Sequence, residues 1–365
     1  MNTKNQSRTT PRSPRAQAQP RARASARPHV RPSVRGKPKL LIISPAKDEA
    51  KYIERTIASV AAQTVTPALW VIVDDGSSDR TGELADAAAA KYPWIKVLHR
   101  PAGTARRVGP GVIEAFYAGL DEAEAAGVDY DYICKLDADL EFPPDYFERL
   151  FARFDAEPAL GTVSGKAYIP AGGRFVLERS GDQFSHGVAK LFRRECFEQI
   201  GGFVREVMWD GIDCHRCRML GWSAESDNDP ALAIKHLRQM GSSYRSVYHG
   251  RLRWGRGQYF MGTHPLYILA IMAYRMLERP WVVGGLLIGV GYLQAALQGR
   301  PRYEDPAFRS HLHRWQLAEL SEKLLGPLRR LFGRKGEGGS DRGRPSPPRY
   351  RGPINGRAGQ RTDAV

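Results

Sequence analysis

Short apolar runs alternate with amphipathic segments through the first part of the chain. Four runs have the composition of buried strands: 39–46 (KLLIISPA), 69–76 (LWVIVDDG), 94–100 (WIKVLHR) and 131–139 (DYICKLDAD). Helices are expected between them, from apolar spacing after residue 50 and over 79–91 and 108–126. Strands and helices of this length form right-handed crossovers onto a mainly parallel sheet. The sequence therefore predicts an α/β fold with a Rossmann-like sheet.

The pattern changes after residue 157 and predicts a mixed second half. Residues 160–169 and 231–237 have the composition of strands, and 187–203 that of a strand, a short helix and a turn. A helix is expected over 211–221. We assign one domain to 39–260.

The basic charge of the chain lies in its two ends. The net charge is +16, of which 1–38 carry +10 and 327–365 carry +7, so that the middle is close to −1. Both ends are rich in Arg, Pro, Ser and Gly and poor in apolar residues, which predicts disordered tails. Basic tails can contact anionic lipid, polyphosphate or RNA by charge alone, but a solvated tail is favoured. The near-neutral middle argues against a specific nucleic-acid partner.

Residues 261–326 are expected to form a helical extension with a very apolar C-terminal segment. The run 281–297 (WVVGGLLIGVGYLQAAL) approaches the length of a membrane span, but it contains four glycines, a tyrosine and a glutamine. Two alternatives remain: helices that lie on or dip into a membrane face, or a buried helical pair. The chain shows no signal-peptide pattern, and four cysteines in 365 residues do not suggest a disulfide framework. We expect a cytoplasmic protein, with the inner face of the plasma membrane as its alternative location.

Acidic residues follow three of the predicted strands. Pro45 and Glu49 follow the first, Asp75 the second, and Asp137 and Asp139 end the fourth. In open α/β sheets, ligands bind beyond the carboxyl ends of the strands. Strand alternation would put Asp137 and Asp139 on one side of the chain, about 7 Å apart. Paired carboxylates there suit a hard cation that also binds diphosphate oxygens.

The segments SPAKDEAKYIERTIASVAAQT, VIVDDGSSDRTGELA and CKLDADLEFPPDYFERL together resemble the nucleotide-binding half of family 2 glycosyltransferases, which have the GT-A fold. The resemblance covers roughly 39–240. It implies a nucleotide-sugar donor, with Pro45, Glu49, Asp75 and Asp137 around the nucleotide. It also implies that Asp139 binds Mn²⁺ or Mg²⁺, and His236 matches a position that often contacts the metal or phosphate.

A catalytic base is expected at the start of the segment WDGIDCHRCRMLGW. Counting back from Gly221 and Trp222 places Asp210 at the base position of the family, with Trp209 where Glu is more usual. Asp213 is the rival, and Asp210 is favoured. A positioned carboxylate can take the proton of an acceptor hydroxyl as that hydroxyl attacks the sugar.

The resemblance implies inverting transfer of a sugar to a hydroxyl of a glycan or lipid-linked glycan, in the synthesis of bacterial surface polysaccharide or glycolipid. One alternative is transfer to a polyprenyl phosphate, which is already ionised and needs no base. A second is a module that binds nucleotide-sugar or glycan without catalysis. The acids at 137, 139 and 210 favour an enzyme over that module.

Overall fold

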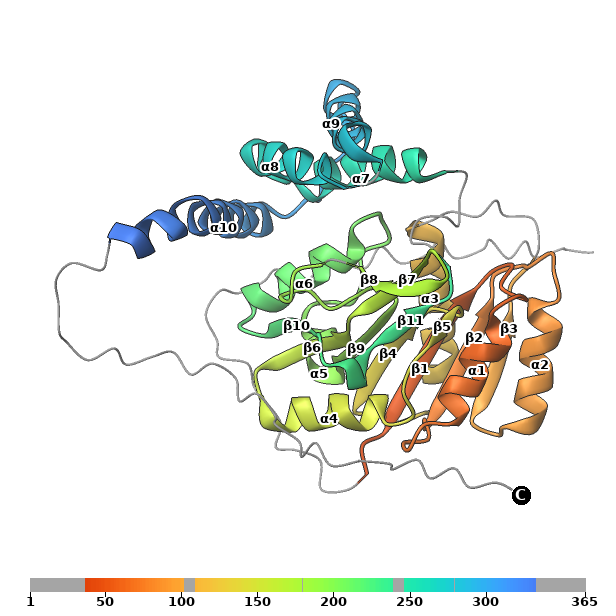
Figure 1. Cartoon of the computed structure of the whole chain (residues 1–365). Coiled ribbons are helices and arrows are strands. Elements are labelled where there is room, and N and C mark those ends of the chain that lie inside the picture. Colours follow the sequence, from red (N-terminus) through yellow and green to blue (C-terminus); the bar gives the residue numbers. More distant parts are fainter. Residues whose placement is uncertain (1–36, 102–108, 179, 239–245, 279, 333–365) are drawn as a thin grey trace, which may run out of the picture. The chain divides into compact units, whose positions relative to one another are not determined.

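The computed structural model of the chain describes residues 37–101, 109–178, 180–238, 246–278 and 280–332 (Figure 1). The chain divides into two compact units, 1–320 and 321–365, and the division falls within the last helix, α10 (Pro306–Phe332). The predicted disordered tails lie almost entirely outside the described residues. Of the second tail, 327–332 belong to α10.

The first unit contains a sheet of seven described strands in the order β10-β6-β9-β4-β1-β2-β3 (Figure 1). The strands are β1 (Leu40–Ala46), β2 (Leu69–Asp74), β3 (Ile95–His99), β4 (Tyr132–Leu136), β6 (Leu160–Gly165), β9 (Ala189–Arg193) and β10 (Ser223–Asp227). Neighbours pair in parallel except around β9, which is antiparallel to β4 and β6. The predicted mainly parallel sheet is confirmed, and it places the carboxyl ends of β4, β1 and β2 side by side.

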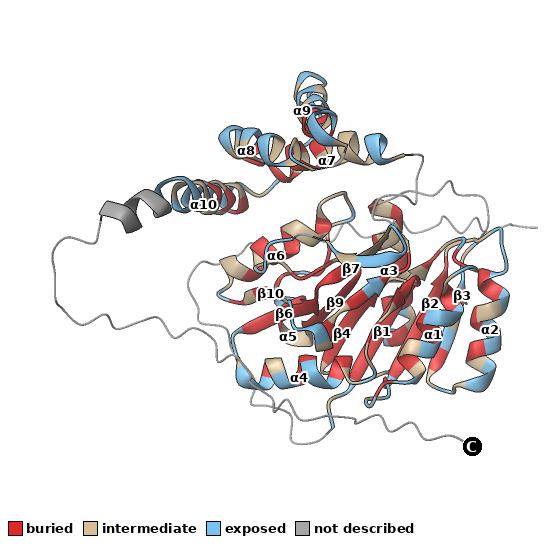
Figure 2. Ribbon diagram, viewed as in Figure 1, coloured by how far each residue is buried: buried red, intermediate tan, exposed pale blue. Residues whose placement is uncertain are grey.

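Helices cover both faces of this sheet (Figure 2). One apolar cluster joins it to α1 (Ile53–Ala61), α2 (Thr81–Lys91) and α4 (Tyr146–Ala156); the other joins it to α3 (Pro110–Ala125), α5 (Arg194–Gln199) and α6 (Trp209–Met219). The α3 helix approaches closely at Gly119, where a Cβ atom would lie 2.7 Å from a methyl group of Ile43 and 2.8 Å from one of Val73. The sheet is therefore buried on both sides, which explains why its strands are nearly continuous apolar runs.

The second half is mixed, as predicted, but two details differ. The single strand expected over 160–169 is two strands, β6 in the large sheet and β7 (Ala167–Ala171) in a small one of order β5-β11-β7-β8. The chain changes sheets at Gly165, where a Cβ atom would lie 1.7 Å from the carbonyl oxygen of Leu232. The other small-sheet strands are β5 (Leu140–Glu141), β8 (Arg174–Leu177) and β11 (Ile234–His236). The edge strand β10 was not predicted, because its sequence SAESD lacks an apolar run.

Three helices follow the mixed region: α7 (Val247–Met261), α8 (Pro265–Arg275) and α9 (Trp281–Leu297). The domain boundary predicted at 260–261 falls at the end of α7. Helices α7 and α9 cross at glycines: a Cβ at Gly255 would lie 2.0 Å from the Ile288 carbonyl oxygen, and one at Gly291 would lie 2.1 Å from that of Leu252. Among the described residues, no helix has both the length and the hydropathy needed to cross a bilayer.

Candidate active site

The predicted nucleotide-binding residues meet at one edge of the large sheet. Pro45 lies near the end of β1, in register with Val73 of β2, and Asp75 follows β2 directly. Asp137 follows β4, which pairs with the other side of β1. The parallel order β4-β1-β2 therefore brings together three segments that are far apart in the sequence (Figure 1).

The strand geometry expected for Asp137 and Asp139 is wrong. Because β4 ends at Leu136, both carboxylates lie beyond the strand and alternation does not relate them. Their surroundings also differ: the side chain of Asp137 is 27% exposed and pairs with Lys135, whereas Asp139 is fully buried. Asp137 can thus meet a ligand directly, while Asp139 is held by the protein.

Asp75 is fixed from two sides. Its Oδ1 atom accepts a hydrogen bond of 2.5 Å from Nη1 of Arg100, and its carbonyl oxygen accepts one of 2.9 Å from Nζ of Lys47. Burial raises the pKa of the Asp75 carboxyl, while Arg100 and Lys47 act in the opposite direction. No described residue donates a hydrogen bond to the second carboxylate oxygen, which can therefore accept one from a ligand.

An ion-pair chain joins Glu49, Arg238, Asp139 and His236. Arg238 donates through Nη2 to Oε1 of Glu49 at 2.7 Å, and its Nε lies 2.6 Å from Oδ2 of Asp139. The same Oδ2 atom lies 2.9 Å from Nε2 of His236. Burial would raise the pKa of Asp139, but His236 and Arg238 lower it. Asp139 is therefore held as a carboxylate within a positively charged surrounding.

The Asp139–His236 pair fits part of a cation site. Oδ1 of Asp139 and Nδ1 of His236 are both buried and have no hydrogen-bond partner among the described residues. One carboxylate oxygen and one imidazole nitrogen do not complete the shell of Mg²⁺ or Mn²⁺, and the described part of the chain holds no cluster of three or more His, Cys, Asp or Glu that could bind a metal. Magnesium sites commonly use one or two carboxylates and take their other ligands from water and substrate phosphates. The residues fit a cation that binds together with a diphosphate.

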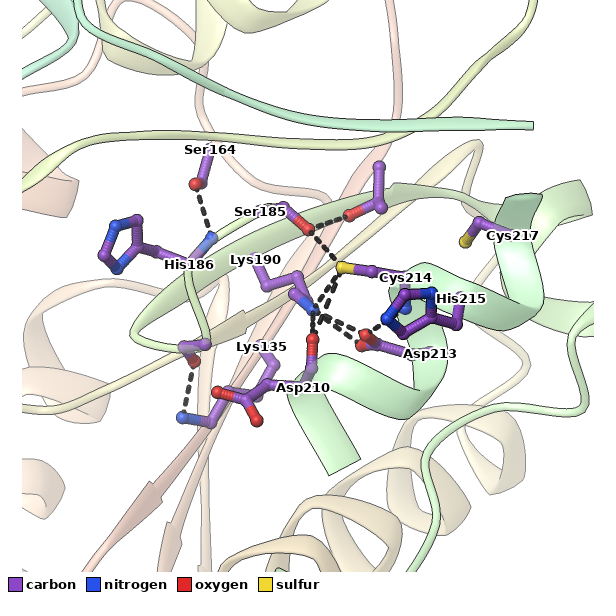
Figure 3. A network of polar contacts seen from close by, with 12 residues as sticks. Lys135, Ser164, Ser185, His186, Lys190, Asp210, Asp213, Cys214, His215 and Cys217 are labelled. Atoms are coloured by element: carbon purple, nitrogen blue, oxygen red, sulfur yellow. Dashed lines mark hydrogen bonds and ion pairs between the residues drawn. The ribbon is translucent and has the colours of Figure 1, made fainter. Parts of the chain in front are cut away.

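Helix α6 carries both candidates for the base, and the structure separates them (Figure 3). Asp213 is 1% exposed, and its two oxygens lie 2.7 and 2.8 Å from Nζ of Lys190, which is fully buried on β9. Burial would lower the pKa of Lys190, but Asp213 raises it. Asp210 is half-buried, and its carboxylate has no hydrogen bond or ion pair to a described residue; only its carbonyl oxygen accepts from Lys190. Asp210 is the carboxylate of the two that remains available to a substrate.

The start of α6 is built to place Asp210. Met208, just before the helix, has a left-handed backbone with φ of 72°, which is strained for a residue with a side chain. A Cβ at Gly187 would lie 3.1 Å from Oδ2 of Asp210, so a glycine leaves room for that carboxylate. Lys135 donates to the carbonyl oxygen of Gly187 at 2.9 Å and also to Asp137. Lys135 thereby connects Asp137 to the segment at Gly187, which lies beside the carboxylate of Asp210.

Sequence reasoning missed four cations around these carboxylates: Lys135, Lys190, Arg238 and Arg100. Lys135 and Lys190 had a signal, because each is a charged residue inside a buried strand. Both lysines also lie against Trp209, which occupies the position where Glu is more usual. Their Nζ atoms lie 5.2 and 5.6 Å from the centre of its ring. The four cysteines are free and buried, as expected without a disulfide framework.

Carboxylates at the ends of parallel strands, a buried Asp–His pair and an available Asp on a nearby helix thus lie at the edge where open α/β sheets bind ligands. Residues 41–204 match the protein family described as Glycosyl transferase family 2. This region of the chain is therefore similar to that family, and the mixed α/β architecture with a large sheet is the one that the resemblance predicted.

Curated relatives resemble part of the chain. Polyprenol monophosphomannose synthase from Mycolicibacterium smegmatis is 29% identical over 46% of this chain and 66% of its own length. Succinoglycan biosynthesis protein ExoA from Rhizobium meliloti is 28% identical over 45% and 52%, and undecaprenyl-phosphate mannosyltransferase from Micrococcus luteus is 31% identical over 37% and 50%. The chain thus spans between half and two thirds of the length of these relatives.

A solved structure of mannosyltransferase PcManGT from Pyrobaculum calidifontis, in complex with GDP-Man and Mn²⁺, is also similar. It is 18% identical, with a TM-score of 0.46, and the match covers 84% of this chain and 91% of that one.

Proposed function

We propose that the chain transfers a sugar from a nucleotide-diphosphate sugar to an acceptor hydroxyl, with inversion at the anomeric carbon and with the help of Mg²⁺ or Mn²⁺. The observation that carries the proposal is the contrast on α6 between Asp213, closed into an ion pair with Lys190, and Asp210, whose carboxylate is available. A hydroxyl is a weak nucleophile, and a carboxylate that takes its proton during attack is what such a transfer requires.

In this proposal Pro45, Glu49, Asp75 and Asp137 surround the nucleotide. Asp75 accepts a hydrogen bond from the base, and Asp137 lies beside the ribose. Asp139 and His236 hold the cation, which would stabilise the charge that grows on the leaving diphosphate. Arg238 supports this group, because it binds Glu49 and Asp139 at once. Asp210 takes the proton from the acceptor on the opposite side of the sugar.

The acceptor proposed is a glycan or lipid-linked glycan of a bacterial surface polysaccharide or glycolipid. The names of the relatives support this class, since they include a polysaccharide biosynthesis protein and two enzymes named for polyprenyl phosphates. The last two also support the alternative, in which the acceptor is a polyprenyl phosphate. An ionised phosphate needs no base, so the two acceptors differ in how far they depend on Asp210.

Peripheral contact with a membrane, at the inner face of the plasma membrane, is proposed for α8 and α9. The buried residues of α9 are Ile288 and four small residues (Gly284, Gly285, Gly291 and Ala295), whereas most of its large apolar residues are exposed. Trp281 is 58% exposed and Leu293 57%. A helix in water buries its large apolar side chains, and glycines at helix crossings with large residues outside are typical of helices that face lipid. An exposed apolar face of this kind is therefore better solvated by lipid than by water.

The experiment is a panel of nucleotide-sugars with Mg²⁺ or Mn²⁺, measuring release of the nucleoside diphosphate with and without candidate acceptors. Asp210→Asn should abolish most transfer to a hydroxyl acceptor, whereas Asp155→Asn, on the exposed side of α4, should leave it unchanged. If Asp210→Asn is inactive on hydroxyl acceptors but active on a polyprenyl phosphate, the alternative acceptor is the natural one. Failure to turn over any nucleotide-sugar would refute both.

A further inference from the structure

Glu178, directly after β8, links the candidate active site to the helices α7 and α8. The charges of His236 and Asp210 both act on the pKa of its carboxyl group. It also interacts with Arg251 of α7 and Arg275 of α8. Neither arginine forms an ion pair with Glu178, but the charges of both lower its pKa. Glu178 has no role in the nucleotide site described above.

The carboxylate of Glu178 has an unmet hydrogen bond. Its Oε2 atom is buried and has no partner among the described residues. Burial is also the main reason why the pKa of Glu178 is raised. Buried polar atoms in folded proteins nearly always have a partner, and the exceptions mark places where a ligand or water binds. A hydroxyl group that donates a hydrogen bond would satisfy this atom.

Arg251 and Arg275 face the same indole ring. Their guanidinium carbons lie 6.0 and 5.0 Å from the centre of the Trp254 ring. Arg275 pairs with Glu278, but Arg251 has no hydrogen bond or ion pair to a described residue. Burial and the charge of Arg275 lower the pKa of Arg251, whereas Glu278 and Glu178 act in the opposite direction. Arg251 and Arg275 thus lie together in a half-buried place, and Arg251, which has acids nearby but no ion pair to a described residue, can bind an anion.

The chemistry of these groups defines one ligand. The arginines need an anionic acceptor of hydrogen bonds, and planar guanidinium groups recognise phosphate oxygens in pairs. Glu178 needs a hydrogen-bond donor next to that anion. A sugar attached to a phosphate supplies both, because its hydroxyls donate and its phosphate accepts.

We propose that Arg251 and Arg275 bind the phosphate of a phosphate-linked acceptor, while Glu178 accepts a hydrogen bond from a hydroxyl of the sugar attached to it. This proposal rests on the proposed function and narrows its acceptor to a glycosyl phosphate or diphosphate carried on a lipid. The surroundings agree with such a molecule: the charges of Asp210 and Arg275 both act on Glu178, and Arg275 ends the helix α8, which exposes Leu266 and Leu269. The sugar would then lie near Asp210 and the lipid along α8 and α9.

The test uses the full chain in detergent and a probe that needs no catalysis. Binding of farnesyl diphosphate is measured by calorimetry for the wild type, Arg251→Gln and Arg275→Gln, with Arg300→Gln, an exposed arginine beyond α9, as the matched control. Loss of a charge-assisted hydrogen bond to phosphate should weaken binding about 10- to 100-fold in the first two variants. The control should bind as the wild type does. Equal dissociation constants in all four proteins would overturn the proposal.

Transfer kinetics then identify the source of the phosphate. Two acceptors with the same sugar are compared, one linked to an isoprenyl diphosphate and one to a neutral alkyl chain. Arg251→Gln should lower kcat/KM about 10- to 100-fold for the first and less than about threefold for the second. Glu178→Gln should lower kcat/KM for both acceptors, because the sugar hydroxyl is common to them.

Three results would contradict the assignment. An equal loss of kcat/KM on both acceptors would mean that the arginines do not bind the phosphate. A rise confined to the KM of the nucleotide-sugar would place them in the donor site. Loss of binding to anionic liposomes with unchanged kinetics in detergent would assign them to a phospholipid headgroup. If the wild type transfers sugar to neither acceptor, the proposed function fails, but the calorimetric result still decides whether the arginines bind phosphate.

Discussion

Asp210 and Asp213 lie about one turn apart on α6, yet their conversion to Asn should have opposite effects. Asp213→Asn removes the partner of Lys190, whose Nζ lies 2.7 and 2.8 Å from the two carboxylate oxygens. Both side chains are at most 1% exposed, so water cannot replace the lost charge. Asp210→Asn changes a half-buried carboxylate that has no partner among the described residues.

The size of the stability effect follows from burial. Removal of one member of a buried ion pair typically costs about 3–5 kcal/mol, because the remaining charge stays buried without compensation. Lys190 keeps hydrogen bonds to the carbonyl oxygen of Asp210 at 2.8 Å and to Sγ of Cys214 at 3.3 Å, which places Asp213→Asn near the lower end of that range. The double variant Lys190→Met with Asp213→Leu removes both charges and should recover most of the loss.

Activity should follow the opposite order. A positioned general base contributes about 10²- to 10⁴-fold, so kcat of Asp210→Asn should fall by that factor while the KM for the nucleotide-sugar changes little. The free energy of unfolding of this variant should stay within about 0.5 kcal/mol of the wild type. Asp213→Asn should keep kcat within about tenfold when it is measured on folded protein, because Lys190 still binds the backbone of Asp210.

The assay is denaturant unfolding followed by tryptophan fluorescence, together with steady-state kinetics on the same preparations. A stable but inactive Asp213→Asn and an active Asp210→Asn would refute the assignment of roles. An Asp213→Asn variant as stable as the wild type would show that Lys190 is not charged in the folded protein.

Three further outcomes are expected. Asp139→Ala should abolish turnover and donor-dependent Mn²⁺ binding. In electron paramagnetic resonance, the wild type should bind Mn²⁺ weakly until a nucleoside diphosphate is added. Tight Mn²⁺ binding without nucleotide would contradict the conclusion that the protein supplies only part of the metal's ligands. His186 is buried, and burial lowers its pKa from 6.5 to about 4, so stability that is present above pH 6.5 should decline by about 3 kcal/mol as the pH falls to 4. His186→Gln should flatten that decline in pH-dependent unfolding, and an unchanged slope would exclude His186 as its source. Replacement of three exposed residues of α9, Leu286, Val290 and Leu293, by Ser should reduce flotation with anionic liposomes at least about tenfold. Unchanged flotation would show that this face of α9 does not bind lipid.

The sequence by itself determined the layout of the large sheet. Apolar runs such as LLIIS and WVIV form strands because they are buried on both faces, and helical spacing between them dictates crossovers onto a parallel sheet. That layout also fixes where Pro45, Asp75 and Asp137 lie, since residues that follow parallel strands gather at one edge. These features depend on local periodicity and chain order, which one sequence contains in full.

The environment of each carboxylate was decided by tertiary structure. The register of the sequence favoured Asp210 over Asp213, but it did not show that Lys190 on β9 forms an ion pair with Asp213. Asp139 and Glu49 become one unit through Arg238, which is 189 residues from Glu49 in the chain. The exposed apolar face of α9 likewise depends on which side packs against α7. The burial, pairing and exposure of a side chain arise from contacts between distant segments, so they cannot be deduced from the spacing of residues within one segment.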